Sequence, residues 1–414
     1  LPVTIRIKPG QEGTIQGDFD PPRLSLVVTA VLRFRVPGNE KPIEKFVGPL
    51  AREPAPALLD LVDPLSVSSV HIGDAHPPLA ADLSMPMLDM LEGMPKSGLE
   101  GFIMPFEGGV TEPRLEFLQP HVKGRIPVVF IHGLASDEGT WFDMINDLRA
   151  CPFFQRYYEP WVYHYPTGAS FLPAAAVLRQ SLRRIVRELD PDGEEKQLQN
   201  LVLVGHSMGG LHAKLQVVAS GDHLWNAMAR VPFDTVRMPS SIRAKIEPSL
   251  FFKPVTNVTR VVFIATPHQG SSLASLALGK IASLTVERPP ELTAIHDQLV
   301  AENPGALRPE FEEALPTTIQ LLAPKSPLLE ALYGLRPPCW VTIHNVIGVA
   351  HHTLRGERTD CIDSESSARH PGAISELDVK ATHTGVHHKL TTIAEIERIL
   401  QLHLIETGLR TIGK

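Results

Sequence analysis

The sequence predicts an α/β protein with a mostly parallel central sheet flanked by helices. Two observations lead to this prediction: short, wholly apolar runs such as 127–131 and 201–204, and helical stretches such as 174–189 between them. Apolar runs of this length are typical of parallel strands that are buried on both faces. Their alternation with helices is typical of a sheet covered on both sides. Residues 1–120 lack this alternation, which indicates a separate β-rich N-terminal region.

The predicted elements of the N-terminal region are mainly strands. Residues 24–36 alternate apolar and polar side chains with the period of a half-buried strand, and 4–8 and 66–72 are shorter candidates. Residues 48–64 and 76–98 are rich in Pro, Ala, Leu and Met, which predicts short helices and extended loops. We therefore expect a small β-rich region of unknown role that packs on the main domain.

The second predicted domain, residues 121–414, carries the alternation of strands and helices. Its predicted strands are 127–131, 161–165, 201–204, 260–265, 340–347 and 376–381, and its predicted helices include 140–148, 174–189 and 393–404. Two long segments, at about 220–257 and 271–337, interrupt the alternation. Insertions at the carboxyl ends of a parallel sheet usually shape its ligand pocket, so we expect these two to form a cap or lid.

Composition limits the class of protein. The chain has 414 residues and a formal net charge of −7, which argues against a nucleic-acid partner, since that would call for basic stripes. No apolar run approaches the roughly 18 residues that cross a bilayer, so we expect no transmembrane segment, while peripheral contact with lipid stays open. The sequence leaves the oligomeric state undetermined.

Localisation and redox state are also open. The chain begins with Leu1, which indicates a processed form or a fragment. A chain that has lost a signal peptide would belong to the cell envelope or be secreted, and it would otherwise be cytoplasmic. The three cysteines leave at least one thiol unpaired, and their spacing allows a disulfide between Cys339 and Cys361 without indicating one.

The most specific motif is Gly-His-Ser-Met-Gly at residues 205–209. It follows an apolar strand and precedes a helix-compatible stretch, 211–218. A serine hydroxyl becomes a nucleophile when a tight strand-to-helix turn exposes it beside a base, and small flanking residues give that turn its clearance. A glycine-rich turn without chemistry is the alternative, and the presence of both strand and helix disfavours it. We therefore predict that Ser207 is a nucleophile.

A nucleophilic serine needs a base and an oxyanion hole. In this architecture the base follows the last strand, where His383 stands, with His387 and His388 as competitors nearer the final helix. Two backbone N–H groups usually stabilise the developing oxyanion. We expect them to come from Met208, directly after the serine, and from Leu134, in the loop after the first apolar strand.

The acid should follow the preceding strand, 340–347. Asp360 and Asp363 are the nearest aspartates there, and spacing alone does not choose between them. The other histidines suggest no metal, because the sequence has neither His-Glu-x-x-His nor a Cys/His spacing typical of zinc. We interpret His132 and His268 as supporting loop residues, and we expect no cofactor.

Four stretches resemble the α/β-hydrolase superfamily, in particular its bacterial lipase and esterase branch. They are 128–134, 205–210, 263–271 and the C-terminal tract that ends at His383. The resemblance implies an α/β-hydrolase fold from about residue 125 to the C-terminus. In this branch the acid lies in an Asp-Gly-Val-Val-Pro segment, followed by a serine pair or Ser-Ala and then Gly-Ala-x-Ser-Glu.

That register places the acid on Asp360, because Ser367-Ala368 and 372–376 match the pattern. Cys361 stands where the branch has glycine and Asp363 where it has an apolar residue, so Asp363 remains the alternative acid.

The resemblance implies a serine hydrolase that cleaves carboxylic esters through an acyl-enzyme. Ser207, His383 and Asp360 would form the triad, and a small-molecule or lipid ester would be the substrate. One alternative is an amidase or acyltransferase with the same triad, and product analysis with an added alcohol or amine would separate transfer from hydrolysis. A non-catalytic binding protein of the same fold is the other, and a fluorophosphonate probe should not label it.

Overall fold

The computed structural model of the protein describes most of the chain. The described residues are 1–7, 18–19, 24–34, 57–64, 67–72, 74–93, 102, 112–168, 170–272, 290–314, 316–353 and 356–409. The predicted strand positions 8, 35, 36 and 66 lie outside these residues, as does part of the second insertion.

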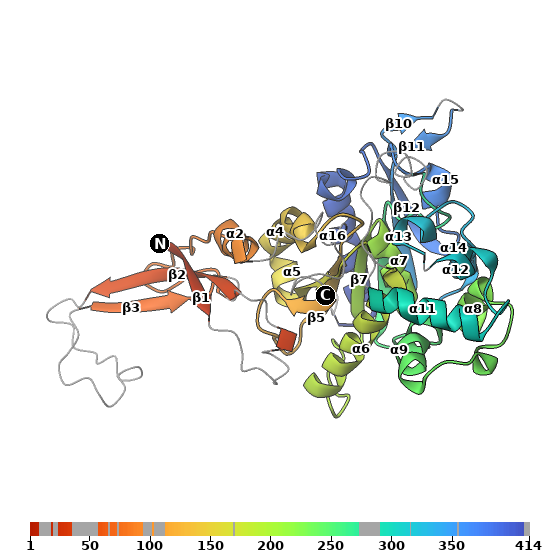
Figure 1. Ribbon diagram of the computed structural model, residues 1–414. Coiled ribbons are helices and arrows are strands. Elements are labelled where there is room, and N and C mark those ends of the chain that lie inside the picture. The colour runs from red at the N-terminus through yellow and green to blue at the C-terminus, as the bar shows by residue number, and fades with distance from the viewer. Residues whose placement is uncertain are drawn as a thin grey trace.

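A seven-stranded sheet forms the centre of the molecule (Figure 1). Its strand order is β12-β9-β8-β7-β5-β6-β4. The strands are β4 Arg114–Phe117, β5 Ile126–Ile131, β6 Tyr158–His164, β7 Leu201–His206, β8 Val258–Ile264, β9 Thr342–Gly348 and β12 Ala373–Val379. The edge strand β4 is antiparallel to β6, and every other neighbouring pair is parallel. The predicted mostly parallel sheet is therefore confirmed.

Helices cover both faces of this sheet. One core contains α6 (Phe171–Leu189) and α7 (Met208–Gln216), and the other contains α4 (Phe142–Ala150) and α16 (Leu390–Glu406), together with α5 (Pro152–Tyr157). Strand β5 supplies alternate residues to the two cores, so all its side chains are buried. This explains why its sequence is apolar throughout.

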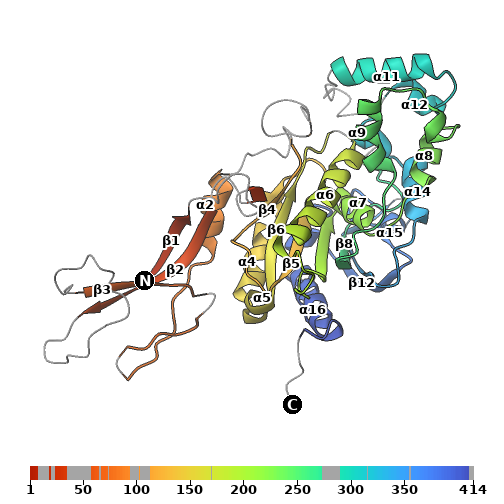
Figure 2. The ribbon, with the colours of Figure 1, turned by 90° about the horizontal axis from the view of Figure 1, so that it is seen from below.

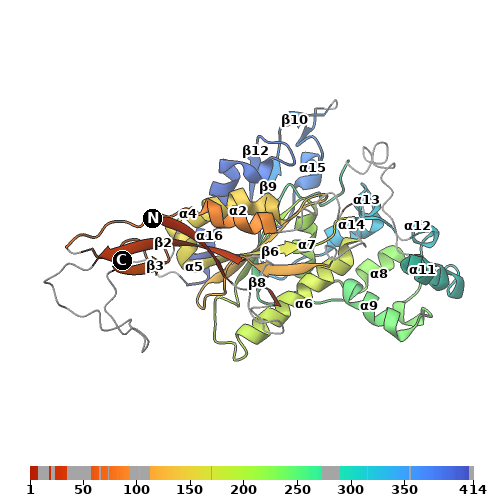
Figure 3. The ribbon, with the colours of Figure 1, turned by 60° about the vertical axis from the view of Figure 1, so that its left-hand side comes forward.

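A separate three-stranded antiparallel sheet lies at the N-terminus. It consists of β1 (Pro2–Ile7), β2 (Leu24–Phe34) and β3 (Ala57–Val62). This sheet projects from the body of the molecule beyond α2 (Ser84–Gly93), as Figures 1 and 3 show. Contact with the body comes from α2, whose Met87 and Met90 join the core beside α4 and α16.

Two N-terminal predictions need correction. Residues 67–72 form only isolated bridges, Ser69 with Pro78 and Ile72 with Ala75, so the strand predicted over 66–72 is wrong. The third strand is β3, within the segment 48–64 for which we predicted helices and loops. Backbone pairing with β2 holds β3 in place. Burial contributes little, because Leu59 and Leu61 are exposed. Its sequence therefore lacks the usual alternation of a half-buried strand.

The edge strand β4 lies within residues 1–120, so the seven-stranded sheet begins before residue 121. Its Phe117 is fully buried and stacks on Phe19 at 5.4 Å between ring centroids.

The two insertions pack against each other. The first contains α8 (His223–Met228) and α9 (Ser240–Leu250), and the second contains α11 (Pro290–Glu302), α12 (Pro309–Glu313), α13 (Thr318–Leu321) and α14 (Pro327–Gly334). Figure 2 shows α8, α9, α11 and α12 grouped together, far from β1–β3. A bridge joins Ala229 to Leu307, and the Arg308 guanidinium donates to the Asn226 carbonyl at 2.9 Å. The described helices of the two insertions therefore form one group, which we call the cap because these segments are the ones predicted to form a cap or lid.

The remaining described elements are short. They are η1 Glu138–Trp141, η2 Phe233–Thr235, β10 His351–His352, β11 Arg358–Thr359, α15 Glu365–Ala368 and η3 Val386–His388. All three cysteines are free thiols, so the Cys339–Cys361 disulfide does not form. Among the described helices, none combines the length and the apolar character needed to cross a membrane.

Candidate active site

Ser207 lies at the tight turn between β7 and α7. Its backbone has φ 54° and ψ −124°, in a region that residues other than glycine rarely adopt. Two backbone hydrogen bonds hold this conformation: the Ser207 N–H donates to the Ile264 carbonyl at 2.8 Å, and the Gly210 N–H donates to the Ser207 carbonyl at 3.0 Å. The sharp turn points the serine side chain out of the strand direction.

Glycines make this turn sterically feasible. A Cβ on Gly209 would lie 2.1 Å from the Ile131 carbonyl oxygen, and a Cβ on Gly205 would lie 2.5 Å from the Gly209 carbonyl oxygen. The end of β5 and the turn are therefore in direct backbone contact. A side chain at Gly209 would force the turn away from the end of β5, and a side chain at Gly205 would force the end of β7 away from the start of α7.

The structure brings Ser207, His383 and Asp360 into one hydrogen-bonded chain. Ser207 Oγ lies 2.8 Å from His383 Nε2, and His383 Nδ1 lies 2.7 Å from Asp360 Oδ2. All three side chains are buried. The three residues come from segments far apart in the sequence: the turn after β7, the loop after β11 and the loop after β12.

Backbone groups fix the position of Asp360. Its Oδ1 accepts the N–H groups of Ile362 at 2.9 Å and Asp363 at 2.7 Å, which leaves Oδ2 for the histidine. The His383 N–H donates to the Asp360 carbonyl at 2.9 Å, so the two loops are joined through backbone as well as side chains. A Cβ on Gly348, at the end of β9, would lie 2.7 Å from the Asp360 Cβ. Only glycine leaves room for the acid there.

Cys361 occupies a backbone position typical of glycine. Its φ is 84°, in the left-handed half of conformational space that favours glycine. The position where the Asp-Gly-Val-Val-Pro pattern has glycine therefore adopts a backbone conformation that glycine favours, although cysteine occupies it.

Asp363 also approaches the histidine. Its Oδ2 lies 3.3 Å from His383 Nδ1, and the side chain is buried. Burial lowers the pKa of His383, but the Asp360 hydrogen bond and the charges of Asp363 and Asp360 outweigh burial and raise it. Burial and Asp360 raise the pKa of Asp363 to about 6, against the opposing effects of His383 and Ser271.

The two competing histidines have other partners. His387 Nε2 lies 2.7 Å from Thr140 Oγ1, and His388 Nδ1 lies 3.1 Å from Asp143 Oδ2. Burial lowers the pKa of His387 to about 3, with His388 and His383 adding to the effect. Of the three candidates, only His383 is hydrogen-bonded to Ser207 among the described residues.

Backbone N–H groups near Ser207 fit the predicted oxyanion hole. Met208 begins α7, so its N–H lies in the first turn, where a helix has no intrahelical acceptor. Leu134 follows Gly133, whose added Cβ would lie 3.0 Å from the Ser207 Cβ, so this loop lies against the serine. The next N–H, that of Ala135, donates to Thr167 Oγ1 at 3.0 Å and helps to hold the loop.

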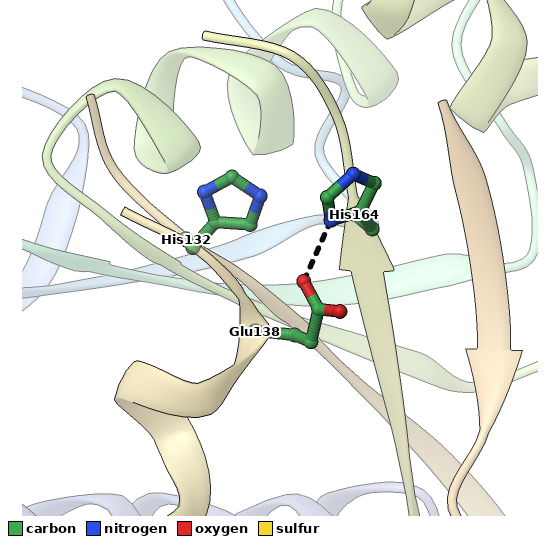
Figure 4. A group of neighbouring side chains, drawn as sticks. All are labelled: His132, Glu138 and His164. Carbon is green, nitrogen blue, oxygen red and sulfur yellow. Dashed lines mark hydrogen bonds and ion pairs between the residues drawn. The ribbon is translucent and has the colours of Figure 1, made fainter. Parts of the chain in front are cut away.

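His132, in the same loop, belongs to a buried polar cluster with Glu138 and His164 (Figure 4). His164 Nδ1 lies 2.7 Å from Glu138 Oε2. The His132 ring stacks on Tyr165, whose hydroxyl donates to the His132 carbonyl at 2.6 Å. These contacts anchor the β5 loop to the end of β6, as expected for a supporting histidine.

Two groups of residues have the composition of a metal site: His132, Glu138 and His164, and Asp360, Asp363 and His383. In the first group, the Tyr165 N–H donates to His132 Nε2 at 3.3 Å and the Arg114 guanidinium lies 3.6 Å from Glu138. We interpret the first group as a network of hydrogen bonds and ion pairs, because the Tyr165 N–H and the Arg114 guanidinium already interact with His132 and Glu138. The second group is the acid and base side of the candidate active site.

Sequence reasoning missed two residues that support this site. His206 Nε2 lies 2.9 Å from the His383 carbonyl oxygen and so helps to place the loop that carries the histidine. Position 206 is one of the two variable positions of the Gly-x-Ser-x-Gly pattern, so the pattern gave no reason to single out His206. Gly348 makes room for Asp360, and a glycine directly after an apolar strand could have indicated such a close approach. His268, predicted as supporting, is buried edge-on against Phe263.

Comparison with known proteins identifies the class. A sequence model described as "Alpha/beta hydrolase family" matches residues 128–387, which is more than half of the chain. The protein therefore belongs to the alpha/beta hydrolase family. A search of curated proteins found no match.

Several solved structures are similar at low identity. The mature lipase BlEst2 of Bacillus licheniformis is 16% identical, with 72% of this chain and 99% of that chain covered and a TM-score of 0.40. The Staphylococcus hyicus lipase is 14% identical, with 70% and 98% covered and a TM-score of 0.40. EstA from Clostridium botulinum is 12% identical, with 68% and 88% covered and a TM-score of 0.42.

Proposed function

We propose that the protein is a serine hydrolase that cleaves carboxylic esters through an acyl-enzyme intermediate. The observation that carries this proposal is the chain from Ser207 Oγ to His383 Nε2 at 2.8 Å and from His383 Nδ1 to Asp360 Oδ2 at 2.7 Å. Both distances are within hydrogen-bond reach, as proton transfer along the chain requires. Membership of the alpha/beta hydrolase family supports the same reaction class.

In the first half of the reaction, Ser207 attacks the ester carbonyl while His383 takes the serine proton. Asp360 holds the imidazole in the tautomer that leaves Nε2 free to accept that proton, and it stabilises the imidazolium that forms. His383 then donates the proton to the leaving alcohol, and the acyl group remains on Ser207.

In the second half, water replaces the alcohol. His383 takes a proton from the water as it attacks the acyl-enzyme and then returns the proton to Ser207 as the acid leaves. The N–H groups of Leu134 and Met208 stabilise the negative charge on the carbonyl oxygen in both halves. This mechanism uses only groups of the protein and needs no cofactor.

The position of the cap suggests a role in substrate binding. The cap is formed by the two insertions, and the second of them leaves the carboxyl end of β8, the strand that pairs with β7 beside Ser207. Segments in this position usually shape the pocket. We therefore propose that the cap binds the acyl or alcohol group of a small-molecule or lipid ester.

The direct test replaces Ser207 by alanine and measures hydrolysis of short p-nitrophenyl esters. The variant should fold as the wild type does and lose essentially all turnover, because the acyl-enzyme cannot form. Ser68→Ala, an exposed serine in the N-terminal region, is the matched control and should keep full activity. Unchanged turnover in Ser207→Ala would refute the proposed function.

A further inference from the structure

We infer that Asp363 is a second positioning carboxylate for His383, so that two acids rather than one hold the catalytic imidazole. The inference rests on the proposed function, in which His383 carries the proton. It concerns a residue to which the mechanism proposed above assigns no role.

The geometry places both acids on the same ring nitrogen. His383 Nδ1 lies 2.7 Å from Asp360 Oδ2 and 3.3 Å from Asp363 Oδ2. The two aspartates come from one short loop, whose backbone hydrogen bond joins the Asp360 N–H to the Asp363 carbonyl at 3.2 Å. Asp360 makes the shorter contact and accepts two backbone N–H groups, so it orients the ring. Asp363 approaches the same nitrogen from a second direction.

Both carboxylates are buried, which strengthens their interaction with the histidine. Asp360 and Asp363 are only 1% and 2% exposed. Charges interact more strongly in such a poorly solvated site than in water. A second negative charge this close therefore has a substantial effect on the charge state of His383.

Among the described residues, several polar and titratable groups surround the pair. His383 faces Ser207 at the turn after β7, His206 at the end of β7 with 5.2 Å between ring centroids, and the nearby imidazole of His387. Asp363 faces Asp360 in its own loop and Ser271 in the segment after β8. Among the described residues, Asp360 and Asp363 are the carboxylates that act on His383.

The arrangement has opposite effects in the resting and reacting states. While His383 is neutral, the two acids repel each other, and Asp363 has a raised pKa of about 6. When His383 accepts the serine proton, the imidazolium faces both carboxylates through Nδ1, and both stabilise it. Asp363 therefore favours the transition state more than the ground state, which is the condition for faster chemistry.

The test is the pH profile of kcat/KM for Asp363→Asn. Removing the second carboxylate lowers the pKa of His383, so the acid limb of the profile should move to lower pH by about one unit. The plateau should fall by roughly tenfold, because the imidazolium loses one stabilising charge. KM should change little, since Asp363 acts through His383 and does not contact the substrate.

A second substitution and a control make the test specific. Asp363→Val replaces the carboxylate by an apolar side chain and should shift the acid limb in the same direction. Asp143→Asn removes a carboxylate that lies 3.1 Å from a different histidine, His388, and is 77% exposed, so it should leave the profile unchanged. Asp360→Asn combined with Asp363→Asn should lose more activity than the two single losses predict, since each acid partly replaces the other.

An acid limb that stays in place in both folded Asp363 variants would overturn the inference. Labelling of Ser207 by a fluorophosphonate separates this outcome from failure of the proposed function. If the wild type is labelled and the limb does not move, only the role of Asp363 is wrong. If the folded wild type is not labelled, the proposed function itself is wrong.

Discussion

Cys361 combines an unfavourable backbone conformation with a place in the loop that carries both acids. Its φ of 84° costs a residue with a Cβ about 1 to 2 kcal/mol relative to glycine. The loop keeps this conformation because the Cys361 N–H donates to Thr359 Oγ1 at 3.1 Å and Asp360 Oδ1 accepts the two N–H groups that follow. The network around the acid therefore outweighs the local strain.

Cys361→Gly should stabilise the protein. Relief of the strain exceeds the extra chain entropy of glycine, so the free energy of unfolding should rise by about 1 kcal/mol in urea denaturation. Cys339→Ser, which removes another exposed thiol without changing the backbone, should have no effect. A loss of stability in Cys361→Gly would show that the loop is not strained at this residue.

Lys214 is a buried cation on α7 close to the candidate site. Its Nζ donates to the Tyr333 carbonyl at 3.2 Å, and burial, with Arg336 nearby, lowers its pKa from 10.5 to about 7. The unfolded chain therefore binds more protons than the folded chain between these two pH values. The free energy of unfolding should rise with pH from about 7 toward 10 because of this residue.

Lys214→Met should remove this pH dependence. Methionine fills similar space without a charge, so the variant should gain most relative to the wild type below about pH 7, and the difference should shrink as the pH rises. Urea denaturation of both proteins at several pH values measures this. A difference that grows with pH would contradict the assigned charge state of Lys214.

At the scale of the elements, the end of β9 positions the acid. Gly348 is the last residue of that strand, and its missing side chain is the space that Asp360 occupies. The strand therefore determines where the acid loop can lie, although it contributes no reacting group.

Gly348→Ala should lower kcat and leave the fold largely intact. The added Cβ would displace Asp360, and a shift of about 1 Å in a positioning group can cost on the order of a hundredfold in rate. Gly334→Ala, at the end of α14 where an added Cβ meets nothing within 4 Å, is the matched control and should keep wild-type activity. Equal activity of the two variants would show that kcat does not depend on the exact position of Asp360.

The elements of the central sheet could be predicted because burial on both faces leaves a continuous apolar run. Strands β5 and β7 are fully buried, and both were expected within a few residues of their observed bounds. Strand β3 could not be predicted, since its pairing with β2 depends on long-range register and two of its leucines are exposed. Register of this kind leaves little local trace in the sequence.

The same distinction holds for the candidate site. Ser207 follows β7 directly and His383 lies four residues after β12, so the motif and the order of the strands brought them together in the prediction. The contact of Asp363 with His383 depends on how a short loop folds around one positive φ at Cys361. Such a loop conformation cannot be derived from residue spacing.

At the scale of the whole molecule, the N-terminal region is tied to the hydrolase body through β4 and α2. Leu115 and Phe117 of β4 are buried in the body, and Met90 of α2 is fully buried there too. We propose that the sheet β1–β3 forms a distinct unit, that Phe19 packs on the body, and that the catalytic domain includes β4.

Two truncations test this division. Loss of residues 1–120 removes the edge strand and should prevent stable folding, because burying each large apolar side chain contributes about 1.5 to 3 kcal/mol. Loss of residues 1–64 keeps α2 and β4 and should leave a folded protein with a cooperative thermal transition. Similar melting temperatures for the two truncated proteins would contradict the proposed boundary.

The central claim is that Ser207 is a nucleophile activated by His383. Reaction with a fluorophosphonate, followed by mass spectrometry of the intact protein and its peptides, tests it most directly. We expect one adduct per wild-type chain, located on Ser207, and none in Ser207→Ala. A folded wild-type protein that takes up no label, or carries the label on another residue, would contradict the claim.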